Sequence, residues 1–174
     1  MRPHNDGAPV FSTRPLVQSD REMLERRFEA LSLETRRLRF FTPQPRLRAQ
    51  ELDYLTNVDQ TDHIALVVCI LEEGGLVEIG VGRAVRLQGR PETAELSLLI
   101  VDEYQGRGAG RFLLTQLAQL SVSAGVRYFQ AAYLAENLAI EHLFRHFGAT
   151  PAEITQGVCE VVLDLKRFAC DEGR

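Results

Sequence analysis

The N-terminal third of the chain combines one strand-like segment with helical patterns. Residues 10–14 are rich in β-prone side chains and predict a short strand. Apolar residues then recur at helical spacing from Met23 to Leu31, and the preceding Ser19 and Asp20 are good N-cap residues. This pattern predicts an amphipathic helix.

A second N-cap candidate, Ser32, precedes another short helical pattern. It stops before Thr42-Pro-Gln-Pro45, because proline prevents the helix from continuing. A further helical stretch is predicted over residues 46–55.

From Asp62 onward the spacing of apolar residues becomes typical of strands, and further along the chain segments with strand and helix spacing alternate. Three strands are expected, at 64–71, 76–87 and 93–101, the first two forming an antiparallel hairpin around Glu72-Glu-Gly-Gly75. Helical spacing continues from Phe112 to Gly125; a strand is then expected at 127–134, a helix at 137–147 closed by Gly148, and a strand at 158–165. We therefore expect a single domain over residues 1–174, mixed α/β around one sheet, with residues 1–9 as a flexible tail.

Composition and charge exclude several classes of protein. The chain has 174 residues, 45% hydrophobic and 25% charged, which excludes disorder as its main state. A net charge of -4 provides no overall basic field, so nucleic acid is not an expected partner. The first 50 residues nevertheless carry 10 arginines against 6 acids, so the basic side lies at this end.

The apolar runs and the cysteines indicate the compartment. The run from Ile64 to Leu71 is far shorter than the roughly 20 residues that a bilayer span needs, and the N-terminus lacks an apolar signal core. Cys69, Cys159 and Cys170 are odd in number and widely spaced, which argues against a disulfide framework or a zinc site. We expect a soluble, cytoplasmic protein without membrane association.

The chemically informative segment runs from Leu98 to Arg111. It reads as a strand, a loop with three alternating glycines, and a helix start. Glycines allow backbone N–H groups to approach a ligand, and a helix N-terminus favours an anion such as a diphosphate. Arg107 and Arg111 add positive charge. The alternative is a strand-to-helix turn without a ligand, for which three glycines would be an entropic cost without a purpose.

Two other glycine-loop classes do not match this segment. A Walker loop requires Gly-Lys-Ser/Thr, which is absent, and in a dinucleotide fingerprint the third glycine would stand where Arg111 stands. The segment Gln105-Gly-Arg-Gly-Ala-Gly110 instead resembles the Q/R-x-x-G-x-G/A acyl-CoA loop of the GNAT superfamily of N-acetyltransferases. The element order from Val10 to Leu165 agrees with that resemblance. Residues 28–41 and His63-Ile-Ala-Leu-Val resemble more weakly the bacterial Pat-type protein-lysine acetyltransferases.

The resemblance implies a fold and a cofactor site. It implies a central, mixed, mostly antiparallel twisted sheet of about six to seven strands with about four to five helices, splayed where acyl-CoA binds. The pantetheine arm of acetyl-CoA would pair with one strand and its diphosphate would bind the glycine loop, with no metal. The cofactor residues carried over are Leu98, Leu99, Ile100, Gln105, Gly106, Arg107, Gly108, Ala109, Gly110, Arg111 and Asn137.

The resemblance also assigns Glu95 as the catalytic general base. An acceptor lysine, with a reference pKa near 10.4, must lose a proton before it can attack. Glu95 lies about 10 Å along the strand from Leu98, a distance that one or two waters can bridge. The alternative is a solvated strand carboxylate, and sharing a face with Ser97 and Leu99 does not decide between the two. Asn137 has two compatible readings, a cofactor ligand and a helix N-cap.

Two further positions bear on the mechanism. Many relatives carry a tyrosine seven residues after the asparagine to protonate the leaving thiolate, and here that position is Phe144. The general acid is thus unassigned. His142 and His146 are four residues apart on a predicted helix, but no third ligand is near, so we expect surface histidines rather than a metal site.

The leading hypothesis is an acetyl-CoA-dependent N-acetyltransferase that acts by direct attack in a ternary complex. Its acceptor would be a primary amine, foremost a protein lysine, with an acyl-CoA synthetase as a candidate partner. Two alternatives are a small-amine acetyltransferase and a non-catalytic acyl-CoA sensor. The basic first 50 residues disfavour a polycationic acceptor.

Overall fold

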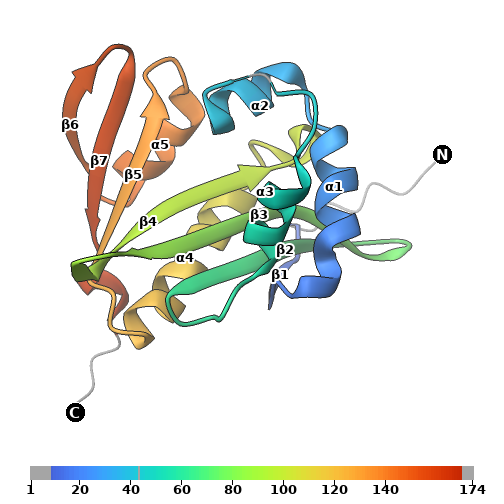
Figure 1. Ribbon diagram of the computed structural model, residues 1–174, viewed down its shortest axis with the longest axis horizontal. Helices are drawn as coiled ribbons and strands as arrows, with labels where there is room; N and C mark the ends of the chain where they lie inside the picture. The colour runs from blue at the N-terminus through green and yellow to red at the C-terminus, as the bar shows by residue number, and fades with distance from the viewer. Residues whose placement is uncertain (1–8, 43, 170–174) are drawn as a thin grey trace.

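The computed structural model describes residues 9–42 and 44–169. Its seven strands form one sheet in the order β1-β2-β3-β4-β5-β7-β6. The strands are β1 (Phe11–Pro15), β2 (His63–Glu72), β3 (Gly75–Leu87), β4 (Arg90–Ile100), β5 (Tyr128–Leu134), β6 (Thr150–Thr155) and β7 (Val158–Asp164). The helices are α1 (Arg21–Glu29), α2 (Leu33–Phe40), α3 (Ala49–Thr56), α4 (Ala109–Ser123) and α5 (Leu138–His146), with 3-10 turns at Gln18–Asp20, Asp102–Tyr104 and Leu165–Phe168. The expected mixed α/β, mostly antiparallel sheet is confirmed (Figure 1).

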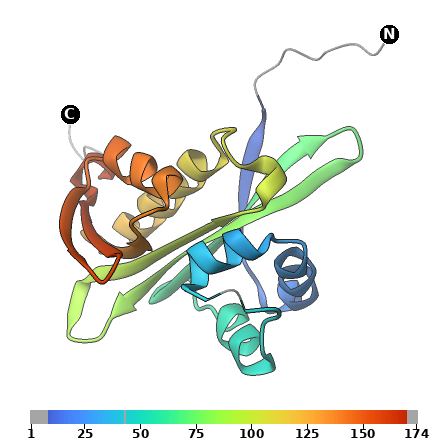
Figure 2. The ribbon, with the colours of Figure 1, turned by 90° about the horizontal axis from the view of Figure 1, so that it is seen from above.

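Helices cover both faces of the β2–β4 half of the sheet. Figure 2 shows α1, α2 and α3 on one side of these strands, and α4 and α5 on the other. Strand β2 is therefore buried on both faces from His63 to Ile70, which explains its nearly continuous apolar run. Ala65, Val67 and Cys69 join the core beneath the first helices, and Leu66 and Val68 join the core beneath α4.

Of the predicted helix N-caps, Ser32 is confirmed and Asp20 has a different role. Ser32 does cap α2, since its hydroxyl accepts a hydrogen bond from Thr35 N at 3.1 Å. Asp20 occupies the N-cap position of α1 but makes no cap bond there. Its carboxylate instead binds the Arg14 guanidinium at 2.7 Å and accepts from Val17 N, so it ties strand β1 to the turn before the helix.

One strand was missed by the pattern analysis. Strand β6 pairs only with β7 and lies at the end of the sheet. An edge strand tolerates proline, and this one includes Pro151, which conceals a strand from pattern reading. Residues 1–8 of the expected N-terminal tail and Cys170 lie outside the described residues, while Cys69 and Cys159 are buried.

The sheet opens between β4 and β5. These two strands run parallel and pair only from Thr93 to Glu95, against Tyr128 to Gln130. Beyond Glu95, β4 stays paired with β3, while β5 stays paired with β7. The two strands diverge from that point (Figure 1), so the β5-facing edge of Leu96–Ile100 has no strand partner within the described part of the chain.

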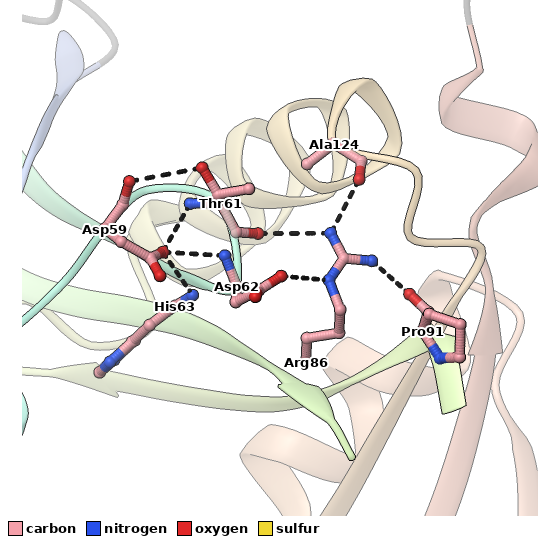
Figure 3. A network of polar contacts seen from close by, with 7 residues as sticks. All are labelled: Asp59, Thr61, Asp62, His63, Arg86, Pro91 and Ala124. Atoms are coloured by element: carbon pink, nitrogen blue, oxygen red, sulfur yellow. Dashed lines mark hydrogen bonds and ion pairs between the residues drawn. The ribbon is translucent and has the colours of Figure 1, made fainter. Parts of the chain in front are cut away.

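A polar network around Arg86 links the loops at the end of the sheet that lies away from this opening. The Arg86 guanidinium binds Asp62 Oδ1 at 2.7 Å and the Ala124 carbonyl, just after α4, at 2.8 Å, and it also reaches the carbonyls of Thr61 and Pro91 (Figure 3). The carboxylate of Asp59 holds the same loop by accepting backbone N–H bonds. One side chain thus joins the start of β2, the start of β4 and the C-terminus of α4.

Replacing Arg86 with methionine should lower the free energy of unfolding by about 2 kcal/mol, because charge-assisted bonds to one ion pair and several carbonyls are lost. For a chain of this size the melting temperature should fall by about 4–8 °C. Arg90→Met is the matched control, since the side chain of exposed Arg90 binds, within the described part of the chain, only Gln130 Oε1, at 3.1 Å. Equal melting temperatures for the two variants would show that the network does not stabilise the fold.

Candidate active site

The opening of the sheet leads into a cleft of about 530 Å³. Its walls are β4, β5, the loop before α4, helix α5 and the end of α2. Ten of the residues expected at the site line it: Glu95, Leu98, Leu99, Ile100, Gln105, Gly106, Gly108, Gly110, Arg111 and Asn137. The structure therefore brings together residues that lie up to 42 positions apart in the sequence.

The glycine loop presents backbone to this cleft. Gly106 and Gly108 have φ angles of +72° and +92°, in the left-handed region that favours glycine. Gly108 is the N-cap of α4, whose first N–H groups lack intrahelical partners and whose dipole is positive at this end. A Cβ at Gly106 would meet open space, so the loop has room for a ligand beside its backbone. The cradle suits an anion such as a diphosphate.

The side chains of Gln105, Arg107 and Ala109 make contacts within the protein. Gln105 Nε2 donates to the Ile100 carbonyl at 2.9 Å and to Thr35 Oγ1 at 3.3 Å, so this side chain shapes the loop. Arg107 is not among the residues that line the cleft, and its guanidinium lies 5.3 Å from the ring centre of Tyr104. Ala109 is buried in the core beneath α4 and can offer only its backbone.

Glu95 lies where the two strands separate. It is the last residue of β4 that pairs with β5, its side chain is exposed, and it lines the cleft. Alternation places Ser97 and Leu99 on its side of β4, facing α2. The carboxylate is thus at the apex of the opening and exposed to solvent.

Helix α5 provides the opposite wall. The Asn137 side chain accepts from Ile140 N at 3.2 Å, so its N-cap role is confirmed, and Asn137 also lines the cleft. Phe144 is buried and packs edge-on against Tyr133 with ring centres 5.7 Å apart. His142 and His146 are exposed on this wall, and no group of three metal-binding side chains occurs among the described residues.

A cluster of hydrogen bonds around Asp102, called here the Asp102 latch, joins the start of α2 to the turn that precedes the glycine loop. The Asp102 carboxylate accepts from Ser32 Oγ at 2.6 Å, Thr35 Oγ1 at 2.7 Å and Ser32 N at 3.1 Å. Burial raises the pKa of Asp102, but these hydrogen bonds outweigh it and hold the pKa below its usual value. The sequence carried no sign of this contact, because its partners are about 70 residues apart.

Asp102→Ala should lower the free energy of unfolding by about 1–3 kcal/mol, because three donors lose a charged acceptor. A carboxyl group whose pKa is lowered by folding stabilises the native state above its unfolded pKa, near 3.9, and this contribution is lost as the pH falls through the folded pKa. The difference in the free energy of unfolding between wild type and variant, measured by urea unfolding, should therefore become smaller below about pH 4. Glu103→Ala is the control, because it removes an exposed carboxylate from the adjacent position. A difference that is independent of pH would contradict the assigned ionic role.

A second, smaller cavity of about 50 Å³ lies beneath α1, α2 and α3 and shares Arg39, Ser97 and Leu99 with the cleft. Arg83 lies deeper in it, directly opposite Ser97 on the neighbouring strand. Sequence reasoning did not single out Arg39 or Arg83, because arginines are abundant in this chain and only strand register shows which of them face the site.

Comparison with known proteins now decides the family. Residues 13–150 match the Acetyltransferase (GNAT) domain family, which is most of the chain. The chain belongs to the GNAT acetyltransferase family. This GNAT domain is 33% identical to Acetyltransferase Pat of Mycolicibacterium smegmatis over 89% of its own length and 46% of the relative's, and 32% identical to an acetyltransferase of Pseudomonas aeruginosa over 80% and 74%. It thus spans about half the length of the Pat protein.

The solved structures agree with the sequence match. The GNAT domain of S. lividans PAT superposes with a TM-score of 0.80 at 28% identity, covering 93% of this chain and 99% of that one. The GNAT resemblance inferred from the glycine loop and the element order is therefore confirmed, as is the closeness to Pat-type domains inferred from residues 28–41 and 63–67. Among the described residues, no helix of this GNAT domain is both long and apolar enough to cross a membrane.

Proposed function

We propose that this GNAT domain is an acetyl-CoA-dependent N-acetyltransferase that transfers the acetyl group to a primary amine, foremost a protein lysine side chain. One observation carries the proposal: a single cleft contains the unpaired edge of β4, the glycine loop at the start of α4 and the Glu95 carboxylate. These are the parts that a thioester donor, its diphosphate and a proton acceptor require. Membership of the acetyltransferase family and the match to Pat support it.

The cofactor would be held by groups of three kinds. Backbone N–H groups around Gly106, Gly108 and Gly110, with Arg111, would bind the diphosphate. The unpaired stretch from Leu98 to Ile100 would pair with the amide-containing arm as an added strand does. Asn137, on the opposite wall, would contact the same arm. When bound, acetyl-CoA supplies the activated acetyl group.

The reaction proposed is one direct transfer. The free amine nitrogen bonds to the acetyl carbonyl carbon, the carbon–sulfur bond breaks, and the proton from nitrogen passes through water to Glu95. The coenzyme leaves as thiolate, a reasonable leaving group because its thiol pKa is near 8.5, as for cysteine. Phe144 offers no hydroxyl to protonate this thiolate, so the proton is proposed to come from solvent. Neither Cys69 nor Cys159 lines the cleft, and burial raises the pKa of the Cys69 thiol, which argues against an acyl-enzyme.

The acceptor is proposed to be a lysine side chain of a protein, with an acyl-CoA synthetase as a candidate, on the strength of the Pat match. The alternative is a small amine, which the small cavity beneath α1–α3 favours, since it lies beside the cleft and is partly enclosed. The exposed carboxylate at the apex argues against a third possibility, a sensor that binds acyl-CoA without turnover.

Two measurements test the proposal. Thermal shifts with saturating acetyl-CoA, free CoA, NAD and ATP should show stabilisation of about 2.7 kcal/mol, or roughly 5–10 °C, with the two CoA species only. Release of CoA should then be followed with lysine peptides and with small amines. No shift with CoA would overturn the cofactor site. A shift without release above hydrolysis would favour the sensor, and faster release with small amines than with any peptide would favour the alternative acceptor.

A further inference from the structure

The small cavity beneath α1–α3 contains two buried or half-buried guanidinium groups without an acidic partner. Arg83 is 6% exposed, and Arg39 lies at the boundary between cavity and cleft. No carboxylate oxygen lies within 4.0 Å of either group anywhere in residues 9–42 or 44–169. By contrast Arg27, on the same cavity wall, is paired with Glu78 at 3.4 Å.

The partners that Arg83 does have are neutral. Its Nη1 donates to the Leu55 carbonyl of α3 at 3.0 Å and lies 3.0 Å from His63 Nε2. Since a guanidinium can only donate, that imidazole nitrogen acts as the acceptor. Burial, and then the charge of Arg83, lower the pKa of His63, which favours the neutral form of the ring. Tyr54 packs on the ring at 5.3 Å between centres. The arginine is therefore held in a fixed position by groups that do not cancel its charge.

Arg39 is less constrained, and like Arg83 it has no ion-pair partner among residues 9–42 and 44–169. Its guanidinium makes no hydrogen bond with any described residue and lies 4.8 Å from the centre of the Phe40 ring. Burial lowers the pKa of Arg39, an effect that the charge of Glu95 opposes. Burial, followed by repulsion from Arg39, lowers the pKa of Arg83 to about 10, so Arg83 still carries charge at neutral pH. A guanidinium group keeps its proton in proteins, so Arg39 is charged as well. Two like charges in one partly buried site are costly unless an anion joins them.

The geometry limits what that anion can be. The cavity of about 50 Å³ has room for a few water molecules, or for a carboxylate and part of its carbon stem. Arg83 faces Ser97, two residues from Glu95 on the same side of β4, which places its backbone about 7–8 Å from that of Glu95. An acceptor whose amine approaches Glu95 can therefore extend a carboxylate to the arginines over about one side-chain length.

We propose that Arg39 and Arg83 form a carboxylate-binding subsite that selects amine acceptors carrying a carboxylate about one side-chain length from the reacting nitrogen. This inference rests on the proposed acetyl transfer and narrows its acceptor class. Two sources provide that chemistry: an acidic residue beside a target lysine in a protein, or the carboxylate of a small amino acid. Arg39 and Arg83 are specificity-determining residues in this scheme and take no part in the proton transfer.

The test uses two matched pairs of acceptors. One pair is a lysine peptide flanked by glutamate and the same peptide flanked by glutamine; the other is Nα-acetyl-lysine and its amide. The wild type should favour the carboxylate member of at least one pair by about tenfold or more in kcat/KM, the scale of a charge-assisted bond pair. Preference in the peptide pair identifies an acidic flanking residue, and preference in the small pair identifies a free acid.

Variants assign the preference to the two arginines. Arg83→Met and Arg39→Met should bring the ratio close to one and leave the KM for acetyl-CoA unchanged. Arg26→Met, which removes the same charge from an exposed position on α1, should keep the ratio. The acetyl-CoA thermal shift reports whether each variant is folded; if Arg83→Met is not, Arg39→Met still decides, since it removes no hydrogen bond.

The outcomes separate this inference from the proposed function. Turnover with a ratio near one in the wild type, or a ratio retained in the folded arginine variants, would overturn the carboxylate subsite alone. Absence of turnover with all four acceptors, in a protein that still binds acetyl-CoA, would overturn the proposed transfer and the subsite together.

Discussion

Glu95→Gln should lower the turnover number by about 10²- to 10⁴-fold while the affinity for acetyl-CoA stays nearly constant. At neutral pH only about one lysine in 2,000 is the free amine, so the rate depends on a group that accepts its proton. Glu95 is exposed at the apex of the sheet opening, where a chain of water molecules can reach the acceptor. Glutamine keeps the size of the side chain but cannot take up the proton.

The measurement is steady-state release of CoA across pH 6–9, together with the acetyl-CoA thermal shift. Turnover of the variant should recover partly as the pH rises, because more of the acceptor is already deprotonated. Glu92→Gln is the matched control: it lies on the same strand, exposed and paired with Arg127 at 3.2 Å, outside the cleft. If Glu95→Gln kept the turnover of Glu92→Gln, another group would have to act as the base.

Gly80→Ala should destabilise the domain by about 3 kcal/mol, a fall of roughly 6–12 °C in melting temperature. A Cβ at this position would lie 2.4 Å from the Leu99 carbonyl oxygen and 2.6 Å from the Ile100 side chain. Backbone cannot yield as a flexible side-chain tip can, so β3 and β4 must separate. The same displacement would move the β4 stretch proposed to hold the cofactor arm, and the KM for acetyl-CoA should rise.

Gly74→Ala is the control for Gly80→Ala, because a Cβ at Gly74 meets nothing within 4 Å and its φ is not in the left-handed region. It should change neither the melting temperature nor the KM appreciably. Thermal unfolding and acetyl-CoA saturation curves of both variants make the comparison. A Gly80→Ala protein as stable as Gly74→Ala would mean that β3 and β4 tolerate separation, contrary to the close approach seen here.

Several elements of the fold were predictable because they depend on neighbouring residues. Ser32 caps α2 through a bond to a residue three positions away, and the hairpin of β2 and β3 turns within a few residues. The glycine loop belongs to the same class, since its φ angles are a property of residues 106 and 108 themselves. Strand β6 was missed because an edge strand with a proline has a weak local pattern.

The site was predictable only where its residues are contiguous. The residues from Leu98 to Arg111 that are proposed to bind the cofactor share one strand and one loop, so a motif could point to them. The Asp102 latch joins residues about 70 positions apart, and Arg83 is placed opposite Ser97 by strand register. No local pattern encodes such pairings, because any one strand can pair with several others at similar local cost.

The sequence by itself thus determined the elements other than β6, the glycine cradle and the family, because these follow from backbone preferences and short motifs. Only the tertiary structure decided where the sheet opens, that Glu95 lies at its apex, and that two arginines without acidic partners lie beside it. Those features arise from the pairing of distant strands and from charges brought together in a shared, partly buried space. Their energies depend on neighbours that the chain acquires only when it folds.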